Sequence, residues 1–265
     1  MIGIFDSGVG GLSVLRAVRA RLPESAILYL GDQAHVPYGS RPLTEVRAFS
    51  EAVTRFLLAE GAQLVVVACN AASAAALHSL RAQFPSLPFV GMEPAVKPAA
   101  ETTRSGTVGV LATPATFQGA LYASVIERFA RGVTVLEDTC PGLVAQIERG
   151  DLEGPGTRAI LERALAPMLA RGMDTVVMGC THYPFVIPLI AQICGPGVRV
   201  IDPAPAVAMQ VERILPTGLG RAAPELRCLT SAALEPFAAL LPRLLGGCCA
   251  PNAVGTVRWN GLELE

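Results

Sequence analysis

Short apolar runs alternate along the chain with longer segments in which apolar residues recur every three or four positions. The apolar runs are rich in β-branched residues, are bounded by turn formers, and occupy residues 1–5, 26–31, 64–69, 89–92, 107–112, 133–136, 175–180, 198–201 and 226–229. Runs of this length predict strands buried on both faces. Helical spacing appears at about residues 12–22, 42–56, 70–84, 118–131, 140–149, 157–171, 206–215 and 234–245. This alternation predicts an α/β fold, with a mostly parallel sheet and helices on both faces.

An internal repeat divides the chain into two halves. Gly3-Ile-Phe-Asp6-Ser-Gly matches Gly109-Val-Leu-Ala-Thr113, Val66-Val-Ala-Cys69 matches Val177-Met-Gly-Cys180, and Gly91-Met-Glu93-Pro-Ala95 matches Val200-Ile-Asp202-Pro-Ala204. The three pairs of anchors have similar spacing in the two halves. Such a duplication predicts two similar, mostly parallel α/β domains related by a pseudo-twofold axis, with the active site in the cleft between them.

Each half carries a cysteine where an apolar run ends, Cys69 in the first half and Cys180 in the second. Ligands of open α/β sheets bind at the carboxyl ends of the strands, so two such cysteines predict one site with a thiol from each side. Each thiol alone could equally be a core residue, since free cysteine is often buried. The repeat favours the shared site. A following helix would also favour the thiolate through its positive end.

Two acid/base groups of one type on opposite faces of a substrate suit an inversion at carbon. One group removes a proton while the other delivers a proton to the opposite face. A free thiol, with a pKa of about 8.5, is a weak base for a carbon acid, so the site must hold it close and stabilise the charge that develops. His182, two residues after Cys180, could accept or supply a proton.

Hydrogen-bonding groups surround both cysteines. Ser7 and the backbone N–H groups of residues 8–11 open a helix and could bind a carboxylate. The corresponding second-half position has Thr113 and Thr116, while Asn70 and Thr181 directly follow the two cysteines. A substrate with two carboxylates would engage both halves. The threonines could instead be helix caps, and the glycine turn could be only a tight strand-to-helix connection.

Composition excludes several other classes of protein. The 265 residues carry a net charge of -1, without the clustered Lys and Arg that a nucleic-acid partner requires. Seven cysteines without regular spacing indicate reduced thiols in a cytosolic protein, and the first residues show no basic or cleavable targeting segment. Residues 61–80, 105–126 and 175–198 lack charges, but polar residues break each of them. They predict buried elements rather than membrane spans, so we expect a cytoplasmic enzyme or binding protein.

The sequence also favours chemistry without a cofactor or a metal. Gly8-Val-Gly10-Gly-Leu-Ser13, followed by Asp32, resembles a dinucleotide fingerprint, but Ser13 replaces its third glycine and the fingerprint explains neither cysteine. The histidines show no metal-site spacing, and His78 is expected to pack within its helix. Pyridoxal phosphate needs a Schiff-base lysine, and the single lysine, Lys97, follows a Pro-Ala turn.

Several motifs together give the chain a resemblance to the glutamate racemases of the cofactor-independent aspartate/glutamate racemase superfamily. The matching segments are Asp6-Ser-Gly-Val-Gly-Gly11, Pro37-Tyr-Gly39, Cys69-Asn70 with Ala72-Ser73, Glu93-Pro-Ala-Val-Lys-Pro98 and Gly179-Cys-Thr-His182. The resemblance covers nearly the whole chain. The resemblance implies interconversion of L- and D-glutamate, which supplies D-glutamate for bacterial peptidoglycan.

The resemblance also implies roles for individual residues. Cys69 would deprotonate D-glutamate and Cys180 L-glutamate, with Asp6, His182 and Glu148 assisting the two thiols. Substrate-contact positions would be Ser7, Asp32, Pro37, Tyr38, Gly39, Asn70, Thr113, Thr116 and Thr181. The family fold implies a discontinuous first domain, residues 1–93 and 206–265, and a second domain, residues 94–205.

Two positions depart from the family pattern. Ala71 stands where the family usually has threonine in Cys-Asn-Thr-Ala-Ser, and Ala115 stands where a glycine is frequent. The missing hydroxyl would remove about 0.5–1.5 kcal/mol of hydrogen bonding and could alter the preferred side chain. A racemase of aspartate or another acidic amino acid therefore stays open, as does a non-catalytic two-domain carboxylate binder. A homodimer is the prior expectation for an enzyme of this size.

Overall fold

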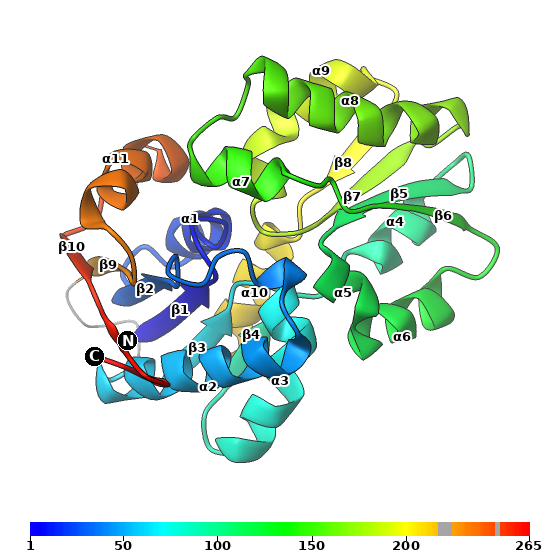
Figure 1. Cartoon of the computed structure of the whole chain (residues 1–265). Coiled ribbons are helices and arrows are strands. Elements are labelled where there is room, and N and C mark those ends of the chain that lie inside the picture. Colours follow the sequence, from blue (N-terminus) through cyan, green and yellow to red (C-terminus); the bar gives the residue numbers. More distant parts are fainter. Residues whose placement is uncertain (217–223, 247–249) are drawn as a thin grey trace.

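Two parallel sheets form the framework of the protein, which the computed structural model describes for residues 1–216, 224–246 and 250–265 (Figure 1). The strands of the first sheet are β1 (Ile2–Asp6), β2 (Ile27–Gly31), β3 (Leu64–Val67), β4 (Phe89–Gly91), β9 (Leu226–Thr230) and β10 (Ala253–Thr256). Those of the second are β5 (Thr107–Ala112), β6 (Thr134–Asp138), β7 (Thr175–Gly179) and β8 (Arg199–Ile201). Every strand pair within these two sheets is parallel.

The predicted repeat is visible in the strand orders, β10-β9-β2-β1-β3-β4 in the first sheet and β6-β5-β7-β8 in the second. The run β2-β1-β3-β4 has the same order as β6-β5-β7-β8, so β1, β3 and β4 correspond to β5, β7 and β8. The prediction of two similar parallel α/β units is thereby confirmed. In the described part of the chain, β9 and β10 extend the first sheet beyond β2 and have no counterpart in the second.

Helices cover the faces of both sheets. They are α1 (Leu12–Arg21), α2 (Leu43–Ala59), α3 (Asn70–Gln83), α4 (Val96–Thr102), α5 (Pro114–Gln118), α6 (Ala120–Phe129), α7 (Leu143–Glu148), α8 (Pro155–Ala170), α9 (Ile187–Cys194), α10 (Ala204–Ile214) and α11 (Leu234–Leu245). Successive strand residues point to opposite faces, so Ile2 and Ile4 of β1 pack in one apolar cluster and Phe5 in another. Both faces of the strand are thus buried, as its continuous apolar run predicts.

Local backbone geometry changes two of the expected helices. The helix expected at 118–131 is instead α5 and α6, because Gly119 between them is extended at φ -72° and ψ 137°. The helix expected from residue 140 begins only at Leu143, because Cys140 and Gly142 have φ of 42° and 89°. The packing role expected for His78 was wrong, since His78 is exposed on α3.

Helix α10 returns the chain from the second sheet to the first, where it packs against α1 and β4. Both termini lie beside the first sheet (Figure 1). A short hairpin follows β10, made by β11 (Trp259–Asn260) and β12 (Glu263–Leu264). The exact division at residues 93/94 and 205/206 stays a prediction.

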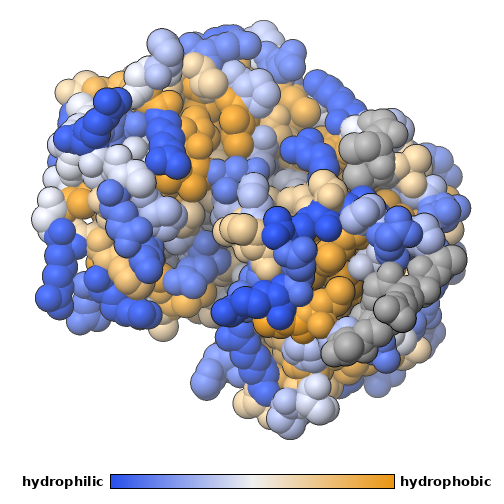
Figure 2. Space-filling model, turned by 180° about the vertical axis from the view of Figure 1, so that it is seen from behind, coloured by the Kyte–Doolittle hydropathy of each residue, from blue (hydrophilic) through white to orange (hydrophobic). Residues whose placement is uncertain are grey.

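The surface is mixed in character. From behind, orange apolar patches are interrupted by hydrophilic side chains (Figure 2). Within the described ranges, no helix is both long and apolar enough to cross a membrane. Cys69, Cys140, Cys180 and Cys194 are free thiols, whereas Cys248 and Cys249 lie outside the described residues.

Candidate active site

Both sequence-predicted cysteines line one small cavity between the two units. Its walls are formed by Ser7, Pro37, Tyr38, Gly39, Cys69, Asn70, Ala71, Thr113, Val144, Cys180, Thr181 and His182. Most of these follow the carboxyl ends of strands, where the parallel arrangement gathers them. The cavity measures about 10 Å³, which is room for about one water molecule. The structure therefore shows the two thiols in a closed site.

Cys69 caps the N-terminus of α3, two residues after β3 ends. Its Sγ accepts a hydrogen bond from Ala72 N at 3.5 Å, and it lies 4.0 Å from Ser7 Oγ. Burial, followed by the negative charge of Asp6, raises the pKa of the Cys69 thiol well above its ordinary value, despite the opposing effect of the Ala72 N–H. The start of α3 thus lowers the pKa of Cys69 through the Ala72 N–H, as expected, but burial and Asp6 outweigh this effect.

Asp6 ends β1 and is fully buried beside Cys69. Gly8 N donates to its Oδ2 at 3.1 Å, and Thr181 Oγ1 donates to its Oδ1 at 3.2 Å, which joins the two halves. Burial raises the pKa of Asp6, and the nearby positive charge of His182 only partly offsets this. The first-half thiol thus has a carboxyl neighbour that tends to hold its proton.

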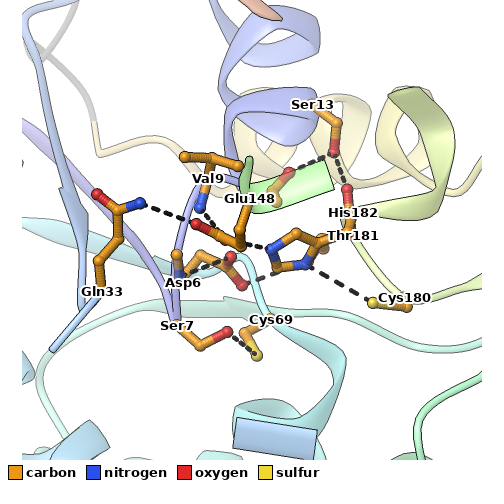
Figure 3. A network of polar contacts seen from close by, with 12 residues as sticks. Asp6, Ser7, Val9, Ser13, Gln33, Cys69, Glu148, Cys180, Thr181 and His182 are labelled. Atoms are coloured by element: carbon orange, nitrogen blue, oxygen red, sulfur yellow. Dashed lines mark hydrogen bonds and ion pairs between the residues drawn. The ribbon is translucent and has the colours of Figure 1, made fainter. Parts of the chain in front are cut away.

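The second thiol has a different neighbour, the imidazole of His182. His182 Nδ1 lies 3.8 Å from Cys180 Sγ, and Nε2 lies 2.5 Å from Glu148 Oε1 (Figure 3). Burial alone would lower the pKa of His182, but its contacts with Cys180 and Glu148 raise it well above the ordinary value. Glu148 shows the reverse balance: burial opposes ionisation, yet hydrogen bonds led by His182 lower its pKa. An imidazolium between a carboxylate and a sulfur is the favoured state.

The glycine turn after β1 binds a carboxylate, but that carboxylate belongs to the protein. Val9 N donates to Glu148 Oε1 at 2.8 Å. A Cβ on Gly8 would lie 2.0 Å from Glu148 Oε1, and one on Gly10 would lie 2.4 Å from His182 Nδ1. Gly8 and Gly10 therefore lack a Cβ where the turn closely approaches the second unit. The expectation that the N–H groups of residues 8–11 bind a substrate carboxylate is corrected at Val9, whose N–H donates to Glu148 instead.

Asn70 and Thr113 present hydrogen-bonding groups to the cavity. Both amide atoms of Asn70, Nδ2 and Oδ1, are buried without a hydrogen-bond partner. Thr113 Oγ1 lies 3.2 Å from Thr116 Oγ1, and Thr116 is buried behind it rather than in the cavity wall. Gly39 faces Thr113 so closely that a Cβ there would lie 2.4 Å from Thr113 Cβ. An unpartnered buried amide is costly unless a ligand satisfies it.

Asp32 is placed apart from the cavity wall. Its fully buried carboxylate accepts hydrogen bonds from four side chains, Tyr38 at 2.6 Å, His35 at 2.9 Å, Ser231 at 2.6 Å and Trp259 at 2.7 Å. Both oxygens are thus engaged within the protein. Tyr38 does line the cavity, so Asp32 reaches the site through Tyr38.

Three polar residues at the site were not predicted from the sequence. Gln33 Nε2 donates to Glu148 Oε2 at 2.8 Å, and Ser13 Oγ lies 2.9 Å from the carbonyl oxygen of Thr181. Tyr29 OH donates to Gly8 O at 2.6 Å and supports the glycine turn. Gln33 follows a predicted strand end directly, and that position is the signal that could have identified it.

A duplicated parallel α/β fold with a thiol from each unit in one buried cavity defines a class of enzyme that can exchange protons at carbon. Residues 12–211 match the family model for Asp/Glu/Hydantoin racemase. The chain is 52% identical over 258 residues to a glutamate racemase of Pseudomonas aeruginosa, with 96% of each chain covered. It belongs to the Asp/Glu/Hydantoin racemase family.

Solved structures of relatives agree with this assignment. A glutamate racemase of Escherichia coli, solved in complex with L-glutamate and an activator, superposes with a TM-score of 0.85 at 30% identity and 98% coverage of both chains. A glutamate racemase of Francisella tularensis, solved in complex with D-glutamate, gives a TM-score of 0.80 at 27% identity, covering 96% of this chain and 95% of that one. The fold prediction is confirmed over nearly the full length.

Proposed function

We propose that this protein interconverts L- and D-glutamate by a two-base mechanism in which Cys69 and Cys180 act on opposite faces of Cα. The observation that carries the proposal is the placement of these thiols, one from each repeat, in the wall of one cavity. Relatives solved with L-glutamate and with D-glutamate support glutamate as the substrate.

The unequal surroundings of the thiols suggest which proton moves first. His182, held as an imidazolium by Glu148, places a positive charge 3.8 Å from the Cys180 sulfur, where negative charge must develop when this thiol acts as the base, whereas burial and Asp6 raise the pKa of Cys69 and hold it as a thiol. In this state Cys180 takes the Cα proton of L-glutamate, and Cys69 delivers its proton to the opposite face to give D-glutamate. The enzyme is then left with a Cys180 thiol and a Cys69 thiolate, and proton exchange through His182 and Asp6 restores the starting state.

Substrate binding requires the closed site to open. A cavity of about 10 Å³ cannot hold an amino acid, so the units must move apart before glutamate enters. The free amide of Asn70 and the side chains of Ser7, Thr113 and Thr181 then supply hydrogen bonds to the substrate carboxylates and amino group. Pro37, Tyr38 and Gly39 form the adjoining wall. Thr116 acts through Thr113, and Asp32 acts through Tyr38.

The wider role follows from the same assignment. We propose a cytoplasmic enzyme that needs no cofactor, supplies D-glutamate for peptidoglycan and forms a homodimer. We also propose that residues 1–93 with 206–265 form one domain and residues 94–205 the other, supported by the packing of α10 against α1. Motion between these domains would open the site.

Deuterium incorporation tests the reaction directly. Folded protein incubated with L-glutamate in D2O, without added cofactor, should yield D-glutamate with deuterium at Cα. Unchanged optical rotation after long incubation would reject the proposal. A parallel panel with aspartate and other acidic amino acids tests whether Ala71 has altered the preferred side chain.

Cysteine variants separate a racemase from a non-catalytic carboxylate binder. Cys69→Ser and Cys180→Ser should each abolish most turnover while leaving the fold intact, because a serine hydroxyl is a far weaker acid than a thiol. A binder would show no turnover in any form and nearly unchanged glutamate affinity in both variants. Growth of a depleted strain on D-glutamate tests the physiological role.

A further inference from the structure

The side chain of Gln33 joins two parts of the protein that the repeat does not relate. Gln33 follows β2, and its Oε1 accepts a hydrogen bond from Thr230 Oγ1 at 2.8 Å at the end of β9. Its Nε2 donates to Glu148 Oε2 at 2.8 Å at the end of α7 (Figure 3). The amide of Gln33 therefore links Thr230 in the first sheet to Glu148 in the second unit.

We propose that Gln33, anchored by Thr230, is a positioning residue that sets the orientation of Glu148 and thereby of His182 beside Cys180. The inference rests on the proposed racemisation, and it extends that proposal to a residue outside the cavity wall. Gln33 does not line the cavity, so its influence on the reaction passes through Glu148.

The hydrogen bonds fix both oxygens of the Glu148 carboxylate. Oε1 accepts from Val9 N and meets His182 Nε2, while Oε2 accepts from Gln33. With both oxygens held, the plane of the carboxylate cannot turn. Without Gln33, Oε2 loses its partner, and the carboxylate can rotate away from the line that joins it to the imidazole.

Thr230 determines which way the amide of Gln33 faces. The backbone N–H of Ala232 donates to Thr230 Oγ1 at 3.2 Å, so the hydroxyl has its own proton free to donate to Gln33 Oε1. The amide nitrogen must then face Glu148, where a carboxylate needs a donor. An amide serves both partners, whereas a carboxylate or an aliphatic side chain at position 33 cannot.

The groups around Glu148 indicate that loss of the Gln33 hydrogen bond should affect one of the two thiols more than the other. His182 is its direct partner, Cys180 lies beyond the imidazole, and Asp6 is the nearby second carboxylate. Cys69 contacts Ser7, Ala72 and Asp6, and it makes no hydrogen bond to His182 or Glu148. Loss of the Gln33 hydrogen bond should therefore slow proton transfer at Cys180 more than at Cys69.

Isotope effects can distinguish the proton-transfer steps at the two thiols. L- and D-glutamate have equal free energies, so kcat/KM must be equal in the two directions for every variant and cannot reveal one-sidedness. A deuterium at Cα of L-glutamate is transferred to Cys180, and one at Cα of D-glutamate to Cys69. In a stepwise reaction, a slower proton transfer at Cys180 makes that step more rate-limiting. The isotope effect measured with labelled L-glutamate then increases, and the one measured with labelled D-glutamate decreases.

The test compares Gln33→Leu and Thr230→Val with the wild type, after racemisation by the wild type has been established. We expect kcat/KM to fall roughly 10-fold or more in Gln33→Leu, the value of one hydrogen bond to a charged group, and less in Thr230→Val. In both variants the isotope effect with [2-2H]-L-glutamate should rise while that with [2-2H]-D-glutamate falls. Thr230→Ser, which keeps the hydroxyl, should restore wild-type values.

Gln83→Leu, at an exposed position on α3, is the matched control and should change nothing. Equal shifts of the two isotope effects, or wild-type kinetics in Gln33→Leu and Thr230→Val, would overturn the inference while leaving the racemase assignment in place. Absence of racemisation by the wild-type protein would instead overturn the proposed function. If Gln33→Leu fails to fold, the comparison of Thr230→Val with Thr230→Ser carries the test.

Discussion

Gly8→Ala is a small change that should separate Glu148 from His182, the imidazole beside Cys180. Gly8 has no positive φ, so alanine fits its backbone. The new Cβ would lie 2.0 Å from Glu148 Oε1, and ordinary contact begins at 3.4 Å. The carboxylate must therefore retreat by about 1.4 Å, which breaks its 2.5 Å contact with His182. Because a side-chain end moves rather than the backbone, the fold should survive.

The fall in activity can be estimated from the lost hydrogen bond between Glu148 and His182. A hydrogen bond to a charged group contributes about 1.5–3 kcal/mol, which corresponds to a roughly 10- to 150-fold fall in kcat/KM if it operates fully in the transition state. The same loss of stability would lower the melting temperature by about 2–4 °C per kcal/mol in a chain of this size. Without its carboxylate partner, His182 should have a lower pKa, so the alkaline limb of the pH–rate profile should move to lower pH.

The assay is racemisation of L-glutamate followed by optical rotation across the pH range. Gly197→Ala is the matched control, because a Cβ there meets nothing within 4 Å and Gly197 itself has no positive φ. A second variant, Glu148→Asp, shortens the side chain by one methylene and moves the carboxylate away from position 8. Adding Gly8→Ala to Glu148→Asp should therefore lower kcat/KM little further. Wild-type activity and an unmoved alkaline limb in Gly8→Ala would refute the reasoning.

Three further results are expected. Asn70→Ala should leave the melting temperature of the free protein unchanged or higher, because its amide has no partner there, but should abolish the rise that glutamate produces. The His182–Glu148 pair should stabilise the fold fully between the unfolded Glu pKa of about 4.3 and the unfolded His pKa of about 6.5, and this stability should be lost as the pH rises to the raised pKa of His182 or falls through the lowered pKa of Glu148. Denaturant titrations of wild type and His182→Gln should differ most between these two unfolded values and converge at alkaline pH. Asp32→Asn, measured the same way, should lose about 2–4 kcal/mol, because an amide cannot accept from all four donors.

Much of the fold was predictable because its strands are buried on both faces. An apolar run such as residues 107–112 has no helical spacing, and it is observed as β5 with the same bounds. The repeat was readable for the same reason, since each half must end the same strands with the same small or polar residues. The interruptions were not predictable, because Gly119 and Cys140 break helices through backbone angles that composition does not determine.

The candidate site was predictable where residues follow strand ends and not where they meet across the two units. Cys69 and Cys180 could be placed from their own strands. The contact of Val9 N with Glu148 could not, because the turn and the carboxylate are far apart in sequence and any acid at that place would satisfy an N–H donor equally well. The environment of Asp32 was hidden for a related reason: two of its partners, Ser231 and Trp259, come from the C-terminal region.

Duplication explains why the protein has two similar thiols, but not why their surroundings differ. The repeat supplies Cys69 and Cys180 at equivalent strand ends, whereas His182 and Asp6 place a cation beside one and a carboxyl beside the other. Two identical environments would hold both sulfurs in the same protonation state, and a reaction that needs one base and one acid could not begin. Strand β9, which the second sheet lacks in the described residues, supports this difference through Thr230 and Gln33. In the proposed mechanism, this departure from symmetry is what allows a symmetric pair of thiols to transfer a proton across one carbon.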